Sequence, residues 1–284
     1  MAELQLAEQS QLRKAFRGVP TFLAVMTLLV LVAVAVFSPA IARFDPKFID
    51  PFARLMPVGS EHWFGTDGYG RDLFSRVVYG SRISLSIGFI AAAMAICTGL
   101  TLGVLAGYFR RLDGLIMSVM DGIMAIPGIL LAIALVALSG ASLVTVLVAV
   151  TIPEVPRVTR LARSIMLSVR SEPYVEVAET LGTRAFTIMY RHMIPNAIPA
   201  LIVQGTYIFA TAMLTEAALS FLGAGIPPEV ASWGNIMADG RAYFMLRPGL
   251  ILFPGVFLSL AVLSINILGD ILRDGLDPKM ARKI

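Results

Sequence analysis

The sequence predicts an all-α integral membrane protein with six transmembrane helices and with both ends of the chain in the cytoplasm. Hydrophobic residues make up 57% of the 284 residues, charged residues make up 15%, and the mean hydropathy is +0.80. A soluble core of this size could not hide that much apolar surface. Six apolar stretches are also long enough to cross a hydrocarbon layer of about 30 Å, which takes about 20 helical residues.

These stretches divide the chain into a lead, a first helix with an outer segment, a five-helix core and a tail. We place the helices at residues 19–42, 83–108, 115–138, 141–161, 198–222 and 250–268. The lead is then 1–18, the first helix with its outer segment is 19–82, the core is 83–272 and the tail is 273–284. The first stretch is longer than the 7–15 apolar residues, roughly, of a secretion signal, so we expect a retained helix.

The positions of Lys and Arg give the orientation. With the N-terminus in the cytoplasm, 15 of the 23 basic residues lie on the inner side, as the positive-inside rule favours. The others, on the outer side, are Arg43, Lys47, Arg54, Arg71, Arg76, Arg82, Arg241 and Arg247. This orientation places the polar segment 171–195 in the cytoplasm. It also accounts for the net charge of +4 without a nucleic-acid partner.

The outer segment 43–82 combines a glycine-rich turn with a helix start. Gly65, Gly68 and Gly70 allow an irregular turn, and Asp72 can cap a short helix that we expect at the membrane surface. The apolar face of that helix consists of Leu73, Phe74, Val77 and Val78. A dinucleotide-binding motif is excluded, because Leu73 stands where its third glycine belongs and no strand precedes it.

Small residues recur every four positions along the second apolar stretch, at Ala91, Ala95, Gly99, Gly103 and Gly107. Such a stripe lets two helices approach closely, because lipid provides no hydrophobic drive for their association. We predict that it packs against another transmembrane helix. Cys97 is the only cysteine, so no intrachain disulfide can form, and we expect its side chain to be buried as a small hydrophobe.

Four polar residues in the apolar stretches are candidates for lining a transport pathway: Asp121, Glu154, Glu216 and Asn266. A carboxylate at the centre of a membrane helix costs about 2.5–3.5 kcal/mol on insertion scales, so each should face protein or a water-filled cavity. Each could equally bond only a neighbouring helix, and the sequence leaves both interpretations open. Proline predicts a kink in the third stretch, at Pro127, and breaks in the fourth.

The polar segment 171–195 predicts two short helices joined by a turn. Pro173 suits a first helical turn, and Gly182 suits the left-handed position just past a helix end. The helix between them would have about two turns, with one small apolar side and one acidic side. A second helix is expected over 184–193, ending at Pro195. Two compact helices in a loop between membrane helices indicate a docking element.

This segment resembles the cytoplasmic EAA loop of bacterial ABC-importer permeases, through Glu176, Ala178, Gly182 and Pro195 at the matching spacing. Other motifs occur in the matching order: His-Trp-Phe-Gly-Thr-Asp at 62–67, Gly-Arg-Asp at 70–72, Ser-Phe-Leu-Gly at 220–223, Ser-Trp-Gly at 232–234, Leu-Gly-Asp at 268–270 and Leu-Asp-Pro at 276–278. From about residue 20 to 280, the chain therefore resembles the second permease subunit of the dipeptide/oligopeptide/nickel ABC-importer family.

The resemblance implies a type I permease fold in the bacterial inner membrane. It also implies a homologous second permease, two cytoplasmic ATPases and an extracytoplasmic solute-binding protein as partners. Docking on the ATPase would use Glu176, Val177, Ala178, Gly182, His192 and Pro195. Val177 and Glu179 depart from the family pattern in the loop, as do Glu229 and Ala231 in the outer connection.

We expect no cofactor on this chain, with ATP and Mg²⁺ bound by the partner ATPases. No lysine follows a glycine, so the chain has no P-loop of its own. Neither a His-assisted nucleophile nor a membrane metal site is expected, because His62 and His192 are the only histidines and lie on opposite sides of the membrane. A secondary transporter driven by an ion gradient is the remaining alternative. Peptides are the favoured substrates, but the sequence does not choose among peptides, nickel chelates and other solutes.

Overall fold

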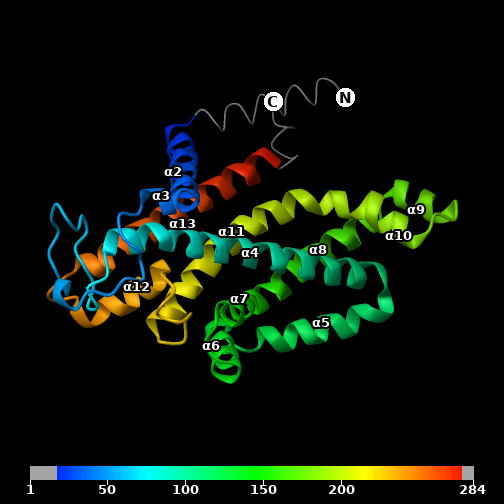
Figure 1. Cartoon of the computed structure of the whole chain (residues 1–284). Helices are drawn as coiled ribbons and strands as arrows, with labels where there is room; N and C mark the ends of the chain where they lie inside the picture. Colours follow the sequence, from blue (N-terminus) through cyan, green and yellow to red (C-terminus); the bar gives the residue numbers. More distant parts are fainter. Residues whose placement is uncertain (1–17, 277–284) are drawn as a thin grey trace.

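The computed structural model describes residues 18–276, and these residues form an all-helical protein in which no β-strand occurs. The long helix α4 runs through the middle of the molecule (Figure 1). The helices α9 and α10 lie at one end, and α12 lies with the 43–72 segment at the opposite end (Figure 1). The expected lead, except Gly18, and the last residues of the expected tail lie outside the described part of the chain.

The α-helices in chain order are α2 (Val19–Val36), α3 (Ser38–Ile41), α4 (Leu73–Tyr108), α5 (Arg110–Met124), α6 (Gly128–Ser139), α7 (Leu143–Thr151), α8 (Val155–Arg170), α9 (Pro173–Thr180), α10 (Ala185–Ile188), α11 (Ile194–Phe221), α12 (Trp233–Gly240) and α13 (Gly249–Leu276). Short 3-10 helices cover Pro51–Ala53, Ile152–Glu154 and Arg241–Tyr243, and a π-helix, η3, covers Met189–Met193.

Four helical runs in residues 18–276 are long and apolar enough to cross a membrane: Val19–Val36, Leu73–Tyr108, Ala185–Phe221 and Gly249–Leu276. The third predicted stretch is broken near Pro127 into α5 and α6, which meet at 87°, and the pair makes a fifth span if counted as one. The fourth predicted stretch is divided at the 3-10 helix Ile152–Glu154, which contains Pro153 and is followed by Pro156 in α8. The predicted count of six helices is therefore not confirmed, and the cytoplasmic placement of the two ends stays a prediction.

The helix α4 begins ten residues before the expected boundary at residue 83. Asp72 caps it as predicted, since its Oδ2 accepts a hydrogen bond from the Ser75 backbone N–H at 2.8 Å. The predicted separate helix at the membrane surface is wrong, because Leu73 and Val77 are buried in one cluster with Trp233 of α12. The apolar face packs against protein and continues into the spanning helix.

The small-residue stripe of α4 packs against α8, as predicted. A Cβ added at Gly99 would lie 2.5 Å from the Val158 Cβ, and one added at Gly103 would lie 2.5 Å from the Ala162 Cβ. Only residues without a Cβ allow this approach. The expectation for Cys97 is wrong: it is exposed, because it lies on the side of α4 away from the stripe.

Candidate functional site

The segment 171–195 forms the predicted helix and turn. Pro173 occupies the first turn of α9, and the helix stops just before Gly182, whose φ is +74°. The Thr183 N–H donates to the Ala178 carbonyl at 3.0 Å, which closes the helix end. A positive φ favours glycine, so the sequence signal and the backbone conformation agree.

The predicted end of the second helix at Pro195 is wrong. The chain passes from α10 through the π-helix Met189–Met193 directly into α11, and Pro195 lies in the first turn of α11. The Ile194 N–H bonds to the Met189 carbonyl, five residues back, at this junction. Proline is tolerated here because a first helical turn needs no N–H at its position.

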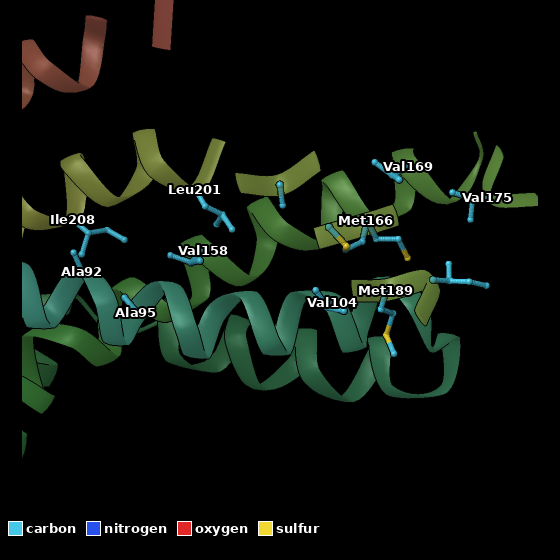
Figure 2. Packing of buried hydrophobic residues seen from close by; sticks show 13 residues of the cluster. Ala92, Ala95, Val104, Val158, Met166, Val169, Val175, Met189, Leu201 and Ile208 are labelled. Carbon is cyan, nitrogen blue, oxygen red and sulfur yellow. The ribbon is translucent and has the colours of Figure 1, made fainter. Parts of the chain in front are cut away.

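The inner side of this segment is anchored in the largest buried cluster of α4, α8 and α11. Val175, Ile188 and Met193 have no solvent exposure, and they pack with Met166 and Val169 of α8. Figure 2 shows Val175 and Met189 at one end of this cluster, whose other end contains Ala92 and Ile208.

A polar tie fixes the base of α9 as well. The Arg170 Nη1 donates to the Tyr108 carbonyl at 2.7 Å, which joins the end of α8 to the end of α4. The Arg170 guanidinium also lies 3.7 Å from the Glu179 carboxylate. The two short helices are therefore held on the membrane helices by both apolar and polar contacts.

The solvent-exposed side of the segment carries large apolar side chains, which we call the docking patch: Tyr174, Val177, Leu181, Phe186 and Tyr190. Leu181 is 79% exposed, and Phe186 is 75% exposed. The Phe186 and Tyr190 rings are parallel, with centroids 6.4 Å apart. Several large apolar side chains exposed on one short polar segment indicate a protein-binding surface.

The predicted docking residues occupy different parts of this segment. Val177 belongs to the docking patch, Glu176 next to it is also exposed, and Ala178 is half-buried against the core. Gly182 forms the turn, and a Cβ added there would meet nothing within 4 Å. The half-buried His192 places its ring centroid 6.0 Å from that of Tyr174, and Pro195 is exposed.

Sequence reasoning missed Leu181, Phe186 and Tyr190. A signal was present, because Val177 and Leu181 are four residues apart, as are Phe186 and Tyr190. Such spacing places each pair on one side of a helix. Which side faces outward depended on how the short helices sit on α8, and the sequence carries no direct sign of that.

The four candidate pathway residues are not brought together. The Asp121 carboxylate is exposed and bonds Arg160 of α8 at 2.6 Å, whereas the buried Glu154 accepts from Arg157 at 2.9 Å. The buried Glu216 accepts from the hydroxyls of Ser220 and Ser232 at 2.9 and 2.8 Å.

Asn266 is exposed on α13. The contacts of Glu216 are those expected for a polar residue that fixes neighbouring elements, and the pathway role of all four stays a prediction.

At the opposite end of the molecule, four charged residues form a buried cluster that sequence reasoning did not single out. Arg71 donates to Asp67 at 2.6 Å and to Asp239 of α12 at 2.7 Å, and Arg76 donates to Asp239 at 3.3 Å. Burial raises the pKa of the Asp239 carboxyl, while Arg76 and Arg71 oppose that rise. The cluster ties the 43–72 segment to α12. Among residues 18–276, no group of His, Cys, Asp and Glu could hold a metal ion.

The sequence matches the family described as "Binding-protein-dependent transport system inner membrane component" over residues 99–282. The chain is 48% identical to the probable peptide ABC transporter permease protein y4tQ of Sinorhizobium fredii, over 84% of this chain and 82% of that protein. It is 42% identical to the dipeptide transport system permease protein DppC of Alkalihalophilus pseudofirmus, over 98% and 93% of the two chains.

A solved structure of the MetNI methionine ABC transporter in an inward-facing conformation has a similar fold. The TM-score is 0.60 at 21% identity, and the match covers 72% of this chain and 98% of that chain. At this identity the likeness concerns the fold alone. The family match and the relatives together show that this chain belongs to the binding-protein-dependent transport system inner membrane components.

Proposed function

We propose that this chain is one of two permease subunits of an ATP-driven peptide importer, and that segment 171–195 docks on a cytoplasmic ATPase. The observation that carries the proposal is the two-sided build of this segment. Val175, Ile188 and Met193 are fully buried against the membrane helices, whereas Leu181 and Phe186 are exposed. The names of the relatives, which include peptide and dipeptide permeases, support a peptide substrate.

Docking would couple the ATPase to the membrane helices through continuous structure. The run Ala185–Phe221 begins in the docking segment and ends at the opposite side of the bundle. A displacement of Phe186 or Tyr190 by the ATPase would therefore move α11 directly. Because packed interfaces change between discrete arrangements, such a displacement could switch the pathway between inward and outward access.

ATP and Mg²⁺ would be bound by the partner ATPases. The chain contributes binding energy and motion rather than hydrolysis, because it has no lysine after a glycine with which to cradle phosphates. A homologous second permease would complete the pathway, and a solute-binding protein would deliver the peptide at the end that carries α12.

The test is co-purification of the ATPases with tagged full-length chain carrying Gly182→Asp. Gly182 has a φ of +74° and open space around its Cβ position, so an added side chain would project from the docking surface. Gly140→Asp is the control, since Gly140 has a φ of +82° and equally open surroundings but lies outside the docking segment. With a ψ of 154°, Gly140 has a backbone conformation that is essentially confined to glycine, so the control carries at least as much strain as Gly182→Asp, about 1–3 kcal/mol.

We expect the wild type and Gly140→Asp to retain a second permease and two ATPases, and Gly182→Asp to lose the ATPases and peptide uptake while staying in the membrane. Equal retention of the ATPases by both variants would refute the docking role. Uptake in vesicles that follows an ion gradient and needs no ATP would instead establish the secondary-transporter alternative.

A further inference from the structure

An apolar groove of about 910 Å³ lies between α2, α4, α11 and α13. On α4 it extends from Arg82 to Ile96, about 21 Å at about 1.5 Å per residue. On α2 it extends from Val36, the last residue of the helix, back to Leu28, about 12 Å. The groove therefore starts at one end of a spanning helix and covers about the depth of one leaflet, half of a hydrocarbon layer of about 30 Å.

A second cavity of about 400 Å³ adjoins the groove at that end, since Arg82 and Ser86 line both. Its other polar lining residues are Lys47, Tyr79 and Glu229. An apolar slot thus opens into a small chamber with two positive charges and one negative charge. By the distribution of Lys and Arg, this chamber lies on the outer side of the membrane.

The charges in this chamber have no partners among residues 18–276. Neither the Arg82 and Lys47 side chains nor the Glu229 carboxylate takes part in a hydrogen bond or an ion pair there. The other six basic residues assigned to the outer side all have such a partner: Arg43, Arg54, Arg71, Arg76, Arg241 and Arg247. All three charged side chains are exposed, and the two cations line one cavity where the apolar groove ends, so an anion held there would meet both positive charges.

We propose that the groove and chamber bind one phospholipid of the outer leaflet. Its phosphate lies between Arg82 and Lys47, and an acyl chain follows α4 toward Ile96. Glu229 adds specificity, because a headgroup that carries a primary amine would place its ammonium against this carboxylate. In such a headgroup the phosphate would face the two cations and the ammonium would face the one carboxylate, so each charge would meet the opposite charge. The inference does not depend on the transport function.

The lining of the groove favours an acyl chain over a peptide. Apart from Arg82, its polar side chains are Ser86 and Thr206. The Thr206 hydroxyl already donates to the Val203 carbonyl at 2.8 Å. A peptide in the groove would leave its backbone N–H and carbonyl groups without hydrogen bonds, which costs free energy for each group, whereas an acyl chain has none.

The experiment measures lipid retained by the purified full-length chain, with any subunits that co-purify, after exchange into vesicles of equal phosphatidylethanolamine and phosphatidylglycerol. Native mass spectrometry counts the lipids that remain bound in detergent. Three variants are compared. The double variant combines Lys47→Gln with Arg82→Gln. The second, Ala93→Phe, fills the groove and leaves every charge intact, and the third is Glu229→Gln. Arg241→Gln is the control, since it removes an outer positive charge away from the groove and chamber.

We expect the wild type and the control to retain one phosphatidylethanolamine per copy of this chain. Retention should fall about tenfold or more in the double variant, because hydrogen bonds to charged groups are lost, and also in Ala93→Phe. Glu229→Gln should keep a bound lipid but lose the preference for the amine headgroup. Unchanged retention in both the double variant and Ala93→Phe would overturn the proposal. The proposal would also be overturned if the groove proved to hold a helix of the second permease in the intact complex, or a peptide in place of a lipid.

Discussion

Replacing Gly103 by alanine should separate α4 from α8. The added Cβ would lie 2.5 Å from the Ala162 Cβ and 2.7 Å from the Thr159 carbonyl oxygen. Carbon atoms prefer separations of about 3.5–4.0 Å, so the helices would have to move apart by about 1 Å. The Thr159 oxygen is part of the α8 backbone, and the Ala162 Cβ is bonded directly to that backbone. Neither atom can therefore move aside unless α8 itself moves.

The magnitude follows from two opposing effects. Overpacking of a tight interface costs about 1–3 kcal/mol, whereas alanine is favoured over glycine in a helix by about 1 kcal/mol. The free energy of unfolding should therefore fall by up to about 2 kcal/mol. In a chain of this size, each kcal/mol lowers the Tm by about 2–4 °C.

The assay is thermal unfolding of the purified complex in one detergent, with Gly114→Ala as the matched control. Gly114 lies within α5, and a Cβ added there would meet nothing within 4 Å, so this variant should gain stability from helix propensity alone. An equal rise of Tm in both variants would refute the close contact between α4 and α8. Because α8 supports the docking segment, the Gly103 variant should also retain less ATPase.

Three further predictions concern the outer end of the molecule, each measured by thermal unfolding. Asp67→Asn should lower the free energy of unfolding by about 3 kcal/mol, because it removes the buried counter-charge of Arg71 and Arg76. Asp239→Asn should lower it by less, and an equal loss would contradict the larger role given to Asp67. Burial raises the pKa of Asp239, so the folded chain holds this proton to a higher pH than the unfolded chain does. Stability should therefore fall as the pH rises from the usual carboxyl range through the raised pKa, and Asp239→Asn should make that slope shallower. Ser232→Ala should cost more than Ser142→Ala. Both remove a helix cap, a loss of about 1 kcal/mol, but Ser142 otherwise bonds only the Thr145 hydroxyl in its own helix, whereas Ser232 bonds the buried Glu216. Equal costs would mean that the bond to Glu216 contributes no more than the bond to Thr145.

The sequence predicted correctly those features that depend on a few neighbouring residues. Pro173 and Gly182 bound α9, and Asp72 caps α4, since each acts through its own backbone geometry or side-chain reach. The small-residue stripe was also predictable, because an unbroken spacing of four along a membrane helix has few uses other than close packing.

Features that depend on distant partners were not predictable in this way. Leu73 and Val77 have the pattern of a surface helix, and only the presence of Trp233 shows that their apolar face is covered by protein. The exposure of Phe186 and Tyr190 likewise depends on how α10 sits on α8. Arg82 and Lys47 are far apart in the sequence, and only the fold brings them to one cavity.

The helical run through Pro195 changes what the docking segment can do. If the helix ended there, a flexible connection would separate segment 171–195 from the membrane helix, and a displacement of Phe186 would not be transmitted to α11. In the structure the run Ala185–Phe221 is unbroken, 37 residues or about 56 Å at about 1.5 Å per residue. Its far end carries Glu216, which bonds Ser232 at the start of α12. A tilt imposed at Phe186 therefore reaches the outer end of the bundle without passing through a flexible loop. The π-turn at Met189–Met193 is the least regular part of this helical run, so we expect a bend between segment 171–195 and α11 to be concentrated there.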